Sequence, residues 1–296
     1  MAGRSYYITC PEVIEVRLTG KLRTGVSAKD IILYVLQQET VKGGVNKVYE
    51  YTGDGVKTLS VPERATITNM GAELGATCSI FPSDENTKVY MDSMGRGDQW
   101  IPLAADDDAQ YLKTIHVDLS ALEPMTACPH SPDKVVTVES LAGMKINQVA
   151  IGSCTNSSYL DLARCAAILK GQKVAENVSL VISPGSRTIL KQMASDGILS
   201  VFLEAGARIL ECGCGPCIGM GQAPNTDGVS LRTFNRNFFG RSGTKSAGIY
   251  LVSCETAAAT ALTGVLTDPR GVDADLDVVM PDSFLCNDNL IIPPAS

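Results

Sequence analysis

Three cysteines lie within six residues in the segment Glu211-Cys-Gly-Cys-Gly-Pro-Cys-Ile-Gly-Met220, and Cys214 and Cys217 form a Cys-x-x-Cys pair. The surrounding glycines and Pro216 let the backbone wrap closely around a bound group. The preceding run, Ala207–Leu210, has the pattern of a short buried strand, and open α/β sheets bind their ligands at the carboxyl ends of strands. Thiolates at this spacing are typical of a zinc site or a redox pair.

A further cysteine, Cys154, lies in the segment Gly152-Ser-Cys-Thr-Asn-Ser157, which also follows a strand-like run, Gln148–Ile151. We therefore expect the two cysteine loops to be neighbours at one edge of a sheet. Cys154, Cys214 and Cys217 would then bring three thiolates together. Such a set suits a metal site that keeps one coordination position open.

These loops need a scaffold, and the hydrophobic pattern predicts strands and helices that alternate along the chain. Ser27, Ser186 and Ser253 are predicted N-caps, and Asp30 completes a capping box after Ser27. The alternation predicts an α/β fold with mainly parallel sheets. Predicted strands cover 13–18, 48–51, 78–81 (expected to be buried), 146–151, 178–182, 208–211 and 248–252; predicted helices cover 27–38, 61–74, 157–169, 186–197, 199–204, 253–262 and a stretch from about 84.

The chain has 296 residues, which is long enough for about two domains. The segment 95–133 is polar and punctuated by proline and aspartate, so we place a domain boundary within it, near residue 117. The predicted domains are 1–117 and 118–296.

The net charge of −7 disfavours binding to nucleic acid or to an anionic membrane surface, since either function needs a basic face. The sequence has no apolar run of 18 residues and no apolar signal core near its N-terminus, so neither a membrane span nor export is expected. Ten cysteines without an export signal indicate reduced thiols and a cytoplasmic protein. The two histidines, His116 and His130, stand in no catalytic context.

Four segments together resemble the aconitase family of iron–sulfur hydro-lyases, and the resemblance covers essentially the whole chain. The segments are Asn69-Met-Gly-Ala-Glu73, Gly152-Ser-Cys-Thr-Asn-Ser157, Cys214-Gly-Pro-Cys217 and Asn235-Arg-Asn-Phe-Phe-Gly-Arg241. The resemblance implies two aconitase-like three-layer α/β domains with mainly parallel sheets. The first would carry the helix with Asn69 and Glu73, and the second would carry the cluster cysteines.

Within the family, two short segments are more similar to aconitate hydratases than to isopropylmalate dehydratases. They are Gly215-Pro216, between the cysteines, and Arg241-Ser-Gly-Thr-Lys245. The expected reaction is therefore the interconversion of citrate and isocitrate through cis-aconitate, with a tricarboxylate substrate. Isopropylmalate or homoaconitate dehydration by a large-subunit fragment is the alternative within the enzyme class.

Dehydration of such a substrate expels hydroxide, a poor leaving group, and a Lewis acid on that oxygen lowers the barrier. The resemblance implies one [4Fe–4S] cluster per chain, held by Cys154, Cys214 and Cys217 with one open iron. It further implies that Glu73 lies next to the open iron and helps handle the hydroxyl. Asn69 and Asn235 would donate hydrogen bonds to the cluster or its sulfurs, and Arg236 and Arg241 would clamp substrate carboxylates. Each of these roles has an alternative. For the cysteines it is a zinc site or a redox pair, and for Glu73 it is a solvated carboxylate on a helix. For the two asparagines it is a cap or turn position, and for the two arginines it is a surface ion pair.

Family members also carry an N-terminal portion with an Asp-Ser-His segment, and a mobile final domain or a separate small subunit. Neither portion is recognisable in this sequence, so we expect both as partners and expect little activity from the chain alone. Two alternatives to an enzyme core remain open. One is a non-catalytic cluster-binding or iron-sensing protein, and the other is a zinc-bound or metal-free scaffold for partner domains.

Overall fold

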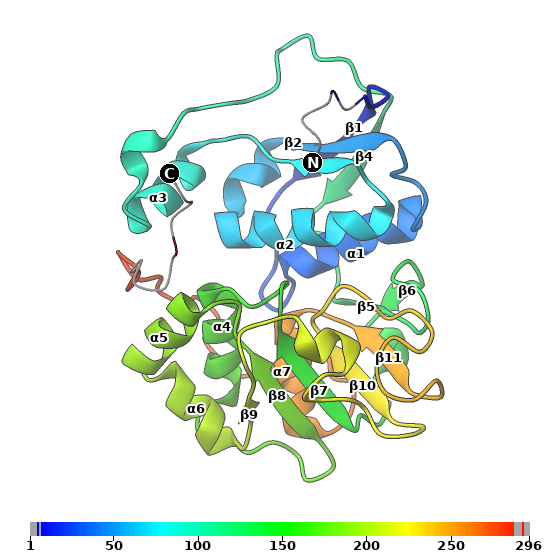
Figure 1. Ribbon diagram of the computed structural model, residues 1–296, viewed down its shortest axis with the longest axis vertical. Coiled ribbons are helices and arrows are strands. Elements are labelled where there is room, and N and C mark those ends of the chain that lie inside the picture. Colours follow the sequence, from blue (N-terminus) through cyan, green and yellow to red (C-terminus); the bar gives the residue numbers. More distant parts are fainter. Residues whose placement is uncertain (1–4, 6, 287–291, 293–296) are drawn as a thin grey trace.

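The computed structural model describes residues 5, 7–286 and 292, and its first half is built on a four-stranded parallel sheet in the order β3-β2-β1-β4 (Figure 1). Figure 1 shows α1 and α2 between this sheet and the second one. The elements of this half are β1 (Glu12–Thr19), α1 (Ala28–Glu39), β2 (Lys47–Thr52), α2 (Val61–Gly71), β3 (Cys78–Ile80), α3 (Glu85–Ser93) and β4 (Lys113–Asp118).

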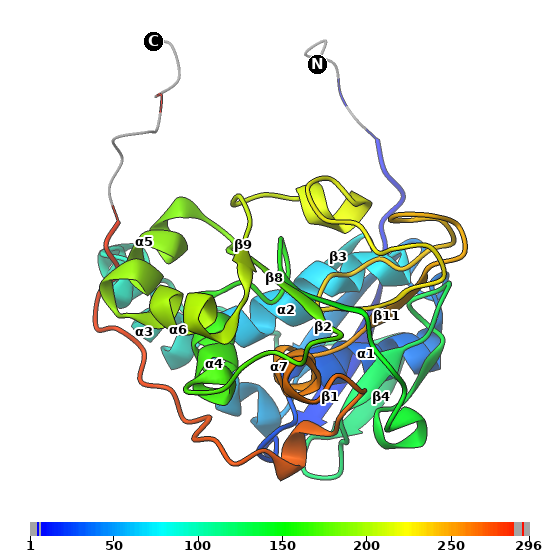
Figure 2. The ribbon, with the colours of Figure 1, turned by 90° about the horizontal axis from the view of Figure 1, so that it is seen from below.

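The second half contains a seven-stranded sheet in the order β6-β5-β11-β10-β7-β8-β9. Strands β11, β10, β7, β8 and β9 are parallel, and β5 and β6 pair antiparallel at one edge. Figure 2 shows α4, α5 and α6 together on one side of the molecule, away from α1 and β4. The elements are β5 (Met125–Ala127), β6 (Val135–Thr137), β7 (Gln148–Gly152), α4 (Tyr159–Leu169), β8 (Ser179–Ser183), α5 (Arg187–Ser195), α6 (Ile198–Ala205), β9 (Arg208–Ile209), β10 (Val229–Arg232), β11 (Gly248–Leu251) and α7 (Cys254–Thr263).

The predicted α/β class with mainly parallel sheets is confirmed, and the helix starts follow the predicted capping residues. Ser27 begins α1 with a capping box to Asp30, and the side chains of Ser186 and Ser253 accept hydrogen bonds from the first turns of α5 and α7. Each cap satisfies backbone N–H groups that have no partner within the helix. No helix in the described part of the chain is both long and apolar enough to cross a membrane.

Three local predictions need correction. The strand at 78–81 was expected to be buried, but Cys78 and Ile80 are exposed because β3 is the edge strand of its sheet. The helix at 61–74 is α-helical only to Gly71 and continues as a 3-10 turn, Ala72–Leu74, so Glu73 lies on the turn. Strand β10 was not predicted, although it lies between β7 and β11.

The two sheets follow one another along the chain, with β4 ending at Asp118 and β5 beginning at Met125. Their packing is continuous, because the apolar cluster that contains the core of the first sheet also includes Met125, Ala127 and Leu251. A division into two domains near residue 117 stays a prediction.

Asp30 ties α1 to the second sheet. Its side chain is fully buried and accepts hydrogen bonds from Ser27 N and Met125 N at 2.8 Å each. Burial raises the pKa of Asp30 to about 7, although these hydrogen bonds favour the carboxylate. The folded state therefore holds this proton more tightly than the unfolded chain does.

The stability of the protein should consequently depend on pH through Asp30. The stabilisation that comes from protonated Asp30 is complete below about pH 4, the ordinary pKa range of an aspartate. It is lost as the pH rises through about 7. Between pH 5 and 8 we expect the free energy of unfolding of the wild type to fall by roughly 2–4 kcal/mol relative to that of Asp30→Asn, which stays neutral. Urea denaturation at a series of pH values measures the difference, and parallel pH profiles for the two proteins would contradict it.

Candidate active site

The loop that carries Cys154 leaves the carboxyl end of β7 in a strained conformation. Gly152, Ser153 and Asn156 all have positive φ angles, of 116°, 69° and 56°. A side chain at Gly152 would place its Cβ only 1.9 Å from the carbonyl oxygen of Ser183 on the neighbouring strand. Such backbone strain persists where the surrounding structure holds it, and it gathers at functional sites. The loop therefore presents Cys154 in a conformation that few sequences can adopt.

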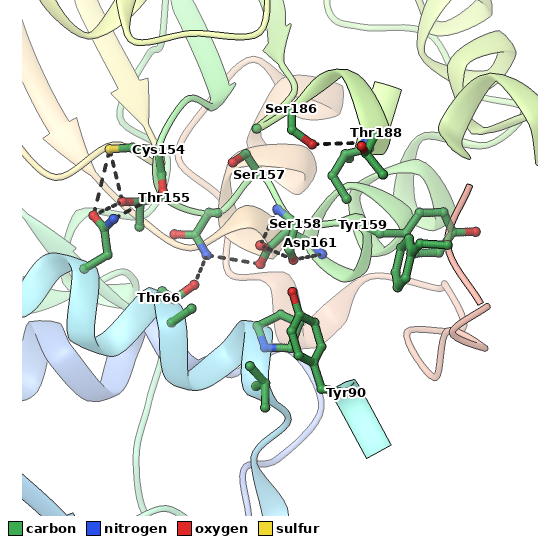
Figure 3. Close-up of a pocket in the computed structure, with 18 of the residues that line it drawn as sticks. Thr66, Tyr90, Cys154, Thr155, Ser157, Ser158, Tyr159, Asp161, Ser186 and Thr188 are labelled. Atoms are coloured by element: carbon green, nitrogen blue, oxygen red, sulfur yellow. Dashed lines mark hydrogen bonds between the residues drawn. The ribbon is translucent and has the colours of Figure 1, made fainter. Parts of the chain in front are cut away.

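The side-chain amide of Asn69, near the end of α2, joins the first half of the chain to this loop. Its Oδ1 accepts hydrogen bonds from Thr155 Oγ1 at 2.6 Å and from Asn235 Nδ2. Its Nδ2 donates to the backbone oxygen of Cys154 at 3.4 Å, and Cys154 Sγ lies 3.8 Å from Oδ1. Figure 3 shows the side chains of Cys154 and Thr155 next to each other in this loop. Asn69 and Asn235 thus bond to each other, and their predicted role as donors to the cluster or its sulfurs stays a prediction.

Of the other two cysteines, Cys214 precedes a short 3-10 turn, Gly215–Ile218, as its N-cap residue, and Cys217 lies within the turn. Cys217 is buried and Cys214 is exposed. Arg241 Nη2 donates a hydrogen bond to Cys217 Sγ at 3.3 Å. Arg232 stabilises this turn, because its Nη1 donates a hydrogen bond to the backbone oxygen of Pro216 at 2.9 Å.

Glu73 and Arg236 form an ion pair in the same region. Arg236 Nε lies 2.7 Å from Glu73 Oε1, and the side chain of Glu73 is only 5% exposed whereas that of Arg236 is 47% exposed. The pKa of Arg236 is raised, first by its hydrogen bond and charge interaction with Glu73, and further by the thiols of Cys217 and Cys154. The guanidinium of Arg236 therefore lies near enough to both cysteine loops to interact with them electrostatically.

Lys29 is a site residue that the sequence did not reveal. It is fully buried, and its Nζ donates to the backbone oxygens of Thr233 and Phe234 at 2.9 Å each and to Asn235 Oδ1 at 3.3 Å. Burial lowers the pKa of Lys29 to about 8. Its only sequence signal is a lysine in the first turn of a helix, directly before the capping-box aspartate, and this pattern alone does not indicate burial.

A cavity of about 380 Å³ opens beside Cys154 and Asn69 (Figure 3). It runs between α2 and the beginnings of α4 and α5. Ser158 and Ser186, the caps of these two helices, lie in its wall, and apolar side chains such as Tyr159 form much of the remainder. The cavity gives small molecules access to the neighbourhood of the Cys154 loop.

The cysteines differ in exposure. All ten are free thiols, with Cys154 and Cys214 exposed. Among the described residues no three His, Cys, Asp or Glu side chains form a group that could hold a single metal ion. Of the six cysteines outside the two cysteine loops, Cys165 and Cys254 are buried, Cys128 is intermediate, and Cys10, Cys78 and Cys286 are exposed.

Residues 1–143 and 139–264 match the model of the aconitase family, described as Aconitase family (aconitate hydratase). The chain belongs to the aconitase family. It is 44% identical over 269 residues to the 3-isopropylmalate dehydratase large subunit 2 of Archaeoglobus fulgidus, covering 90% of this chain and 64% of that protein. It is 42% identical over 263 residues to the 3-isopropylmalate dehydratase large subunit 1 of Thermotoga maritima, covering 88% of this chain and 63% of that protein.

Among solved structures, the chain is similar to Thermococcus kodakaraensis aconitase X in its holo form, with a TM-score of 0.42 and 15% identity over 77% of this chain and 50% of that one. The chain spans slightly less than two thirds of the length of the isopropylmalate dehydratase large subunits, with 64% and 63% of the two proteins named above.

These relatives favour the isopropylmalate alternative over the citrate–isocitrate interpretation drawn from Gly215-Pro216 and Arg241–Lys245. In the structure both segments contact the cysteine loop. Pro216 accepts a hydrogen bond from Arg232, and Arg241 donates one to Cys217.

The strained β7 loop generates a prediction about stability. We expect Gly152→Ala to lower the free energy of unfolding by about 3–5 kcal/mol, because the added Cβ combines steric overlap with an unfavourable φ angle. Gly171→Ala is the matched control, since Gly171 has a φ of 71° and open space around its Cβ position. In the control, the free energy of unfolding should fall by about 1–2 kcal/mol, because the unfavourable φ angle acts there without steric overlap. Equal losses for the two variants in urea denaturation would show that the contact with Ser183 is unimportant.

Proposed function

We propose that this chain is the central part of the large subunit of a [4Fe–4S]-dependent hydro-lyase that dehydrates a 3-isopropylmalate-type hydroxy acid. The observation that carries the proposal is the identity of 38–44% to isopropylmalate dehydratase large subunits over 88–92% of the chain. The grouping of the predicted site residues on loops beside one another supports it.

The residues present fit the proposed cluster. Cys154, Cys214 and Cys217 supply three free thiols on two loops that follow parallel strands. Arg241 Nε and Ser242 Oγ, both beside the Cys217 loop, are buried polar atoms without a hydrogen-bond partner among the described residues. Unpartnered buried donors at this position suit a bound group that carries acceptor atoms. When bound, the cluster would supply Lewis-acid chemistry through its open iron.

The chain's own residues would bind and orient the substrate. Only Nε of Arg236 is engaged by Glu73, so its two terminal nitrogens have no partner among the described residues and can take one substrate carboxylate in a bidentate pair. Arg241 would approach a second carboxylate from the side of Cys217. Glu73, which is nearly buried against Arg236, would help handle the substrate hydroxyl.

We further propose that turnover needs the portion of the relatives that this sequence does not span, together with a small-subunit partner. The names of the relatives describe them as large subunits, which implies a second polypeptide in those enzymes. The division of this chain into domains 1–117 and 118–296 belongs to the same proposal.

The cluster ligands can be tested one by one. Anaerobically reconstituted protein should contain iron and sulfide approaching about four of each per chain. Cys154→Ser, Cys214→Ser and Cys217→Ser should each lose most of both, because each removes one of three protein ligands. Cys212→Ser is the matched control from the same loop and should keep both. Equal loss from the control, or stoichiometric zinc without sulfide in the wild type, would contradict the ligand assignment.

The substrate can be tested with the completed enzyme. Cluster-loaded chain combined with the remaining large-subunit portion and small subunit should produce the unsaturated acid from 3-isopropylmalate faster than from citrate, followed by ultraviolet absorbance. Glu73→Gln should reduce this rate by about 10²–10⁴, the usual range for loss of acid–base help, while leaving iron and sulfide contents unchanged. Faster turnover of citrate would restore the aconitate hydratase interpretation and refute the proposed substrate.

A further inference from the structure

The fully buried ammonium group of Lys29 makes three hydrogen bonds to one short stretch of chain. It donates to the backbone oxygens of Thr233 and Phe234 at 2.9 Å each and to Oδ1 of Asn235 at 3.3 Å. An ammonium group has three donors and no acceptor, so these three successive residues occupy all of its hydrogens. A single lysine from α1 therefore binds the whole beginning of the loop that follows β10.

The backbone of this loop is arranged around the lysine. In a continuing strand the carbonyl groups of successive residues point to opposite sides, whereas those of Thr233 and Phe234 both turn toward one nitrogen. Two buried carbonyl dipoles directed at one point repel each other unless a positive charge lies there. Thr233 is also tied to the end of β7, because its Oγ1 accepts a hydrogen bond from Gly152 N at 2.9 Å. The end of β10 is thus held from two sides.

The position of Lys29 is costly for the helix that carries it. A charge taken out of water is destabilising, and the partners of this one are all neutral. Lys29 also lies in the first turn of α1, where the helix dipole disfavours a positive charge. Its neighbour Asp30 is directed elsewhere, toward Ser27 and Met125. An apolar side chain would avoid these costs, so the role of Lys29 lies in the loop that it holds.

The ammonium group also decides which way two asparagine amides face. Because it can only donate, Asn235 must direct its oxygen toward Lys29 and its Nδ2 away from it. That Nδ2 donates to Oδ1 of Asn69, and Nδ2 of Asn69 in turn donates to the backbone oxygen of Cys154 at 3.4 Å. Every hydrogen bond in this chain therefore runs in one direction, from Lys29 to the Cys154 loop.

This direction determines what the two asparagines offer to a bound group. Both of their oxygens already accept hydrogen bonds. Each Nδ2 makes one hydrogen bond among the described residues and has a second hydrogen to donate. With the amides reversed, their free atoms would be acceptors, which repel an anionic group. The charge of Lys29 thus makes both amides donors at the site.

We propose that Lys29 is a positioning residue of the active site. Its ammonium group fixes the loop that begins at Thr233, and it sets the direction of the hydrogen-bond chain through Asn235 and Asn69. Arg236, which would bind a substrate carboxylate, follows Asn235 directly, so a loosened loop would weaken substrate binding. For the loop and the amides the inference concerns the chain itself, whereas toward the substrate it rests on the proposed function.

The first test uses the metal-free chain, isotopically labelled at asparagine, and measures hydrogen exchange of the Asn235 side-chain amide by nuclear magnetic resonance. The signal of this amide is identified by its loss in Asn235→Asp. Lys29→Met removes the charge and all three donors, and it should speed the exchange by about tenfold or more, because hydrogen bonds from charged donors are among the strongest. Lys29→Gln keeps two N–H donors for three acceptors and should also speed the exchange, which covers the case in which Lys29→Met does not fold.

Leu36→Ala is the matched control, because Leu36 is a fully buried apolar residue of the same helix. It should lower the free energy of unfolding in urea denaturation and leave the exchange rate at Asn235 close to that of the wild type. Equal exchange rates in the wild type and the Lys29 variants would overturn the inference. Equal acceleration in Leu36→Ala would also overturn it, because lost stability alone would then explain the effect.

The second test uses the completed enzyme and measures KM and kcat for 3-isopropylmalate. Lys29→Gln should raise KM by about tenfold, because Arg236 loses its fixed position, and Leu36→Ala should leave KM unchanged. An unchanged KM in a Lys29 variant whose Asn235 amide exchanges faster would refute the positioning role. A wild-type enzyme that does not turn over 3-isopropylmalate would instead refute the proposed function, and the exchange measurement would still decide whether Lys29 fixes the loop and its amides.

Discussion

The parallel pairing of β10, β7, β8 and β9 is the constraint on which the site depends. Parallel strands end at the same edge of a sheet, so the loops after β7, β9 and β10 meet there although they lie up to about 80 residues apart in the sequence. The first half of the chain reaches this edge through α2. The carboxamide of Asn69 then bonds to the Cys154 loop and to Asn235, which follows β10. One amide thus fixes three separate segments relative to one another.

The charge distribution of the site differs from that of the whole chain. The net charge is −7, which argues against binding to nucleic acid. Around the cysteine loops, however, Lys29, Arg232, Arg236 and Arg241 are accompanied by Glu73 as the only carboxylate in direct contact among the described residues. A local excess of positive charge in an acidic protein favours anionic ligands, and the substrate proposed above is one. Net charge therefore constrains which large partners a protein binds, while the buried residues decide what its site attracts.

The sequence was sufficient for most helices and for the motif residues, because capping serines and clustered cysteines are local signals. It was insufficient where a residue's environment depends on distant segments. Strand β10 was not predicted because Ser230 and Arg232 interrupt its apolar pattern. Both residues are nevertheless fully buried, since Gln148 and Pro216 form hydrogen bonds with their polar atoms. Lys29 escaped for the same reason, because its partners Thr233–Asn235 lie about 200 residues further along the chain. Buried polar residues are recognisable only when their partners are known.

The same limit explains why the motifs indicated the family but favoured aconitate hydratases, whereas the relatives favour the isopropylmalate alternative. Isocitrate and 3-isopropylmalate share a hydroxyl group and two carboxylates, and they differ in a carboxymethyl group against an isopropyl group. The roles proposed for Cys154, Cys214, Cys217, Glu73, Arg236 and Arg241 all concern the shared part. A motif built from them constrains the reaction type and says nothing about the group in which the substrates differ. The side chains that contact this differing group must therefore distinguish the two substrates. A site that offers no cation to the third carboxylate rejects the substrate that carries it.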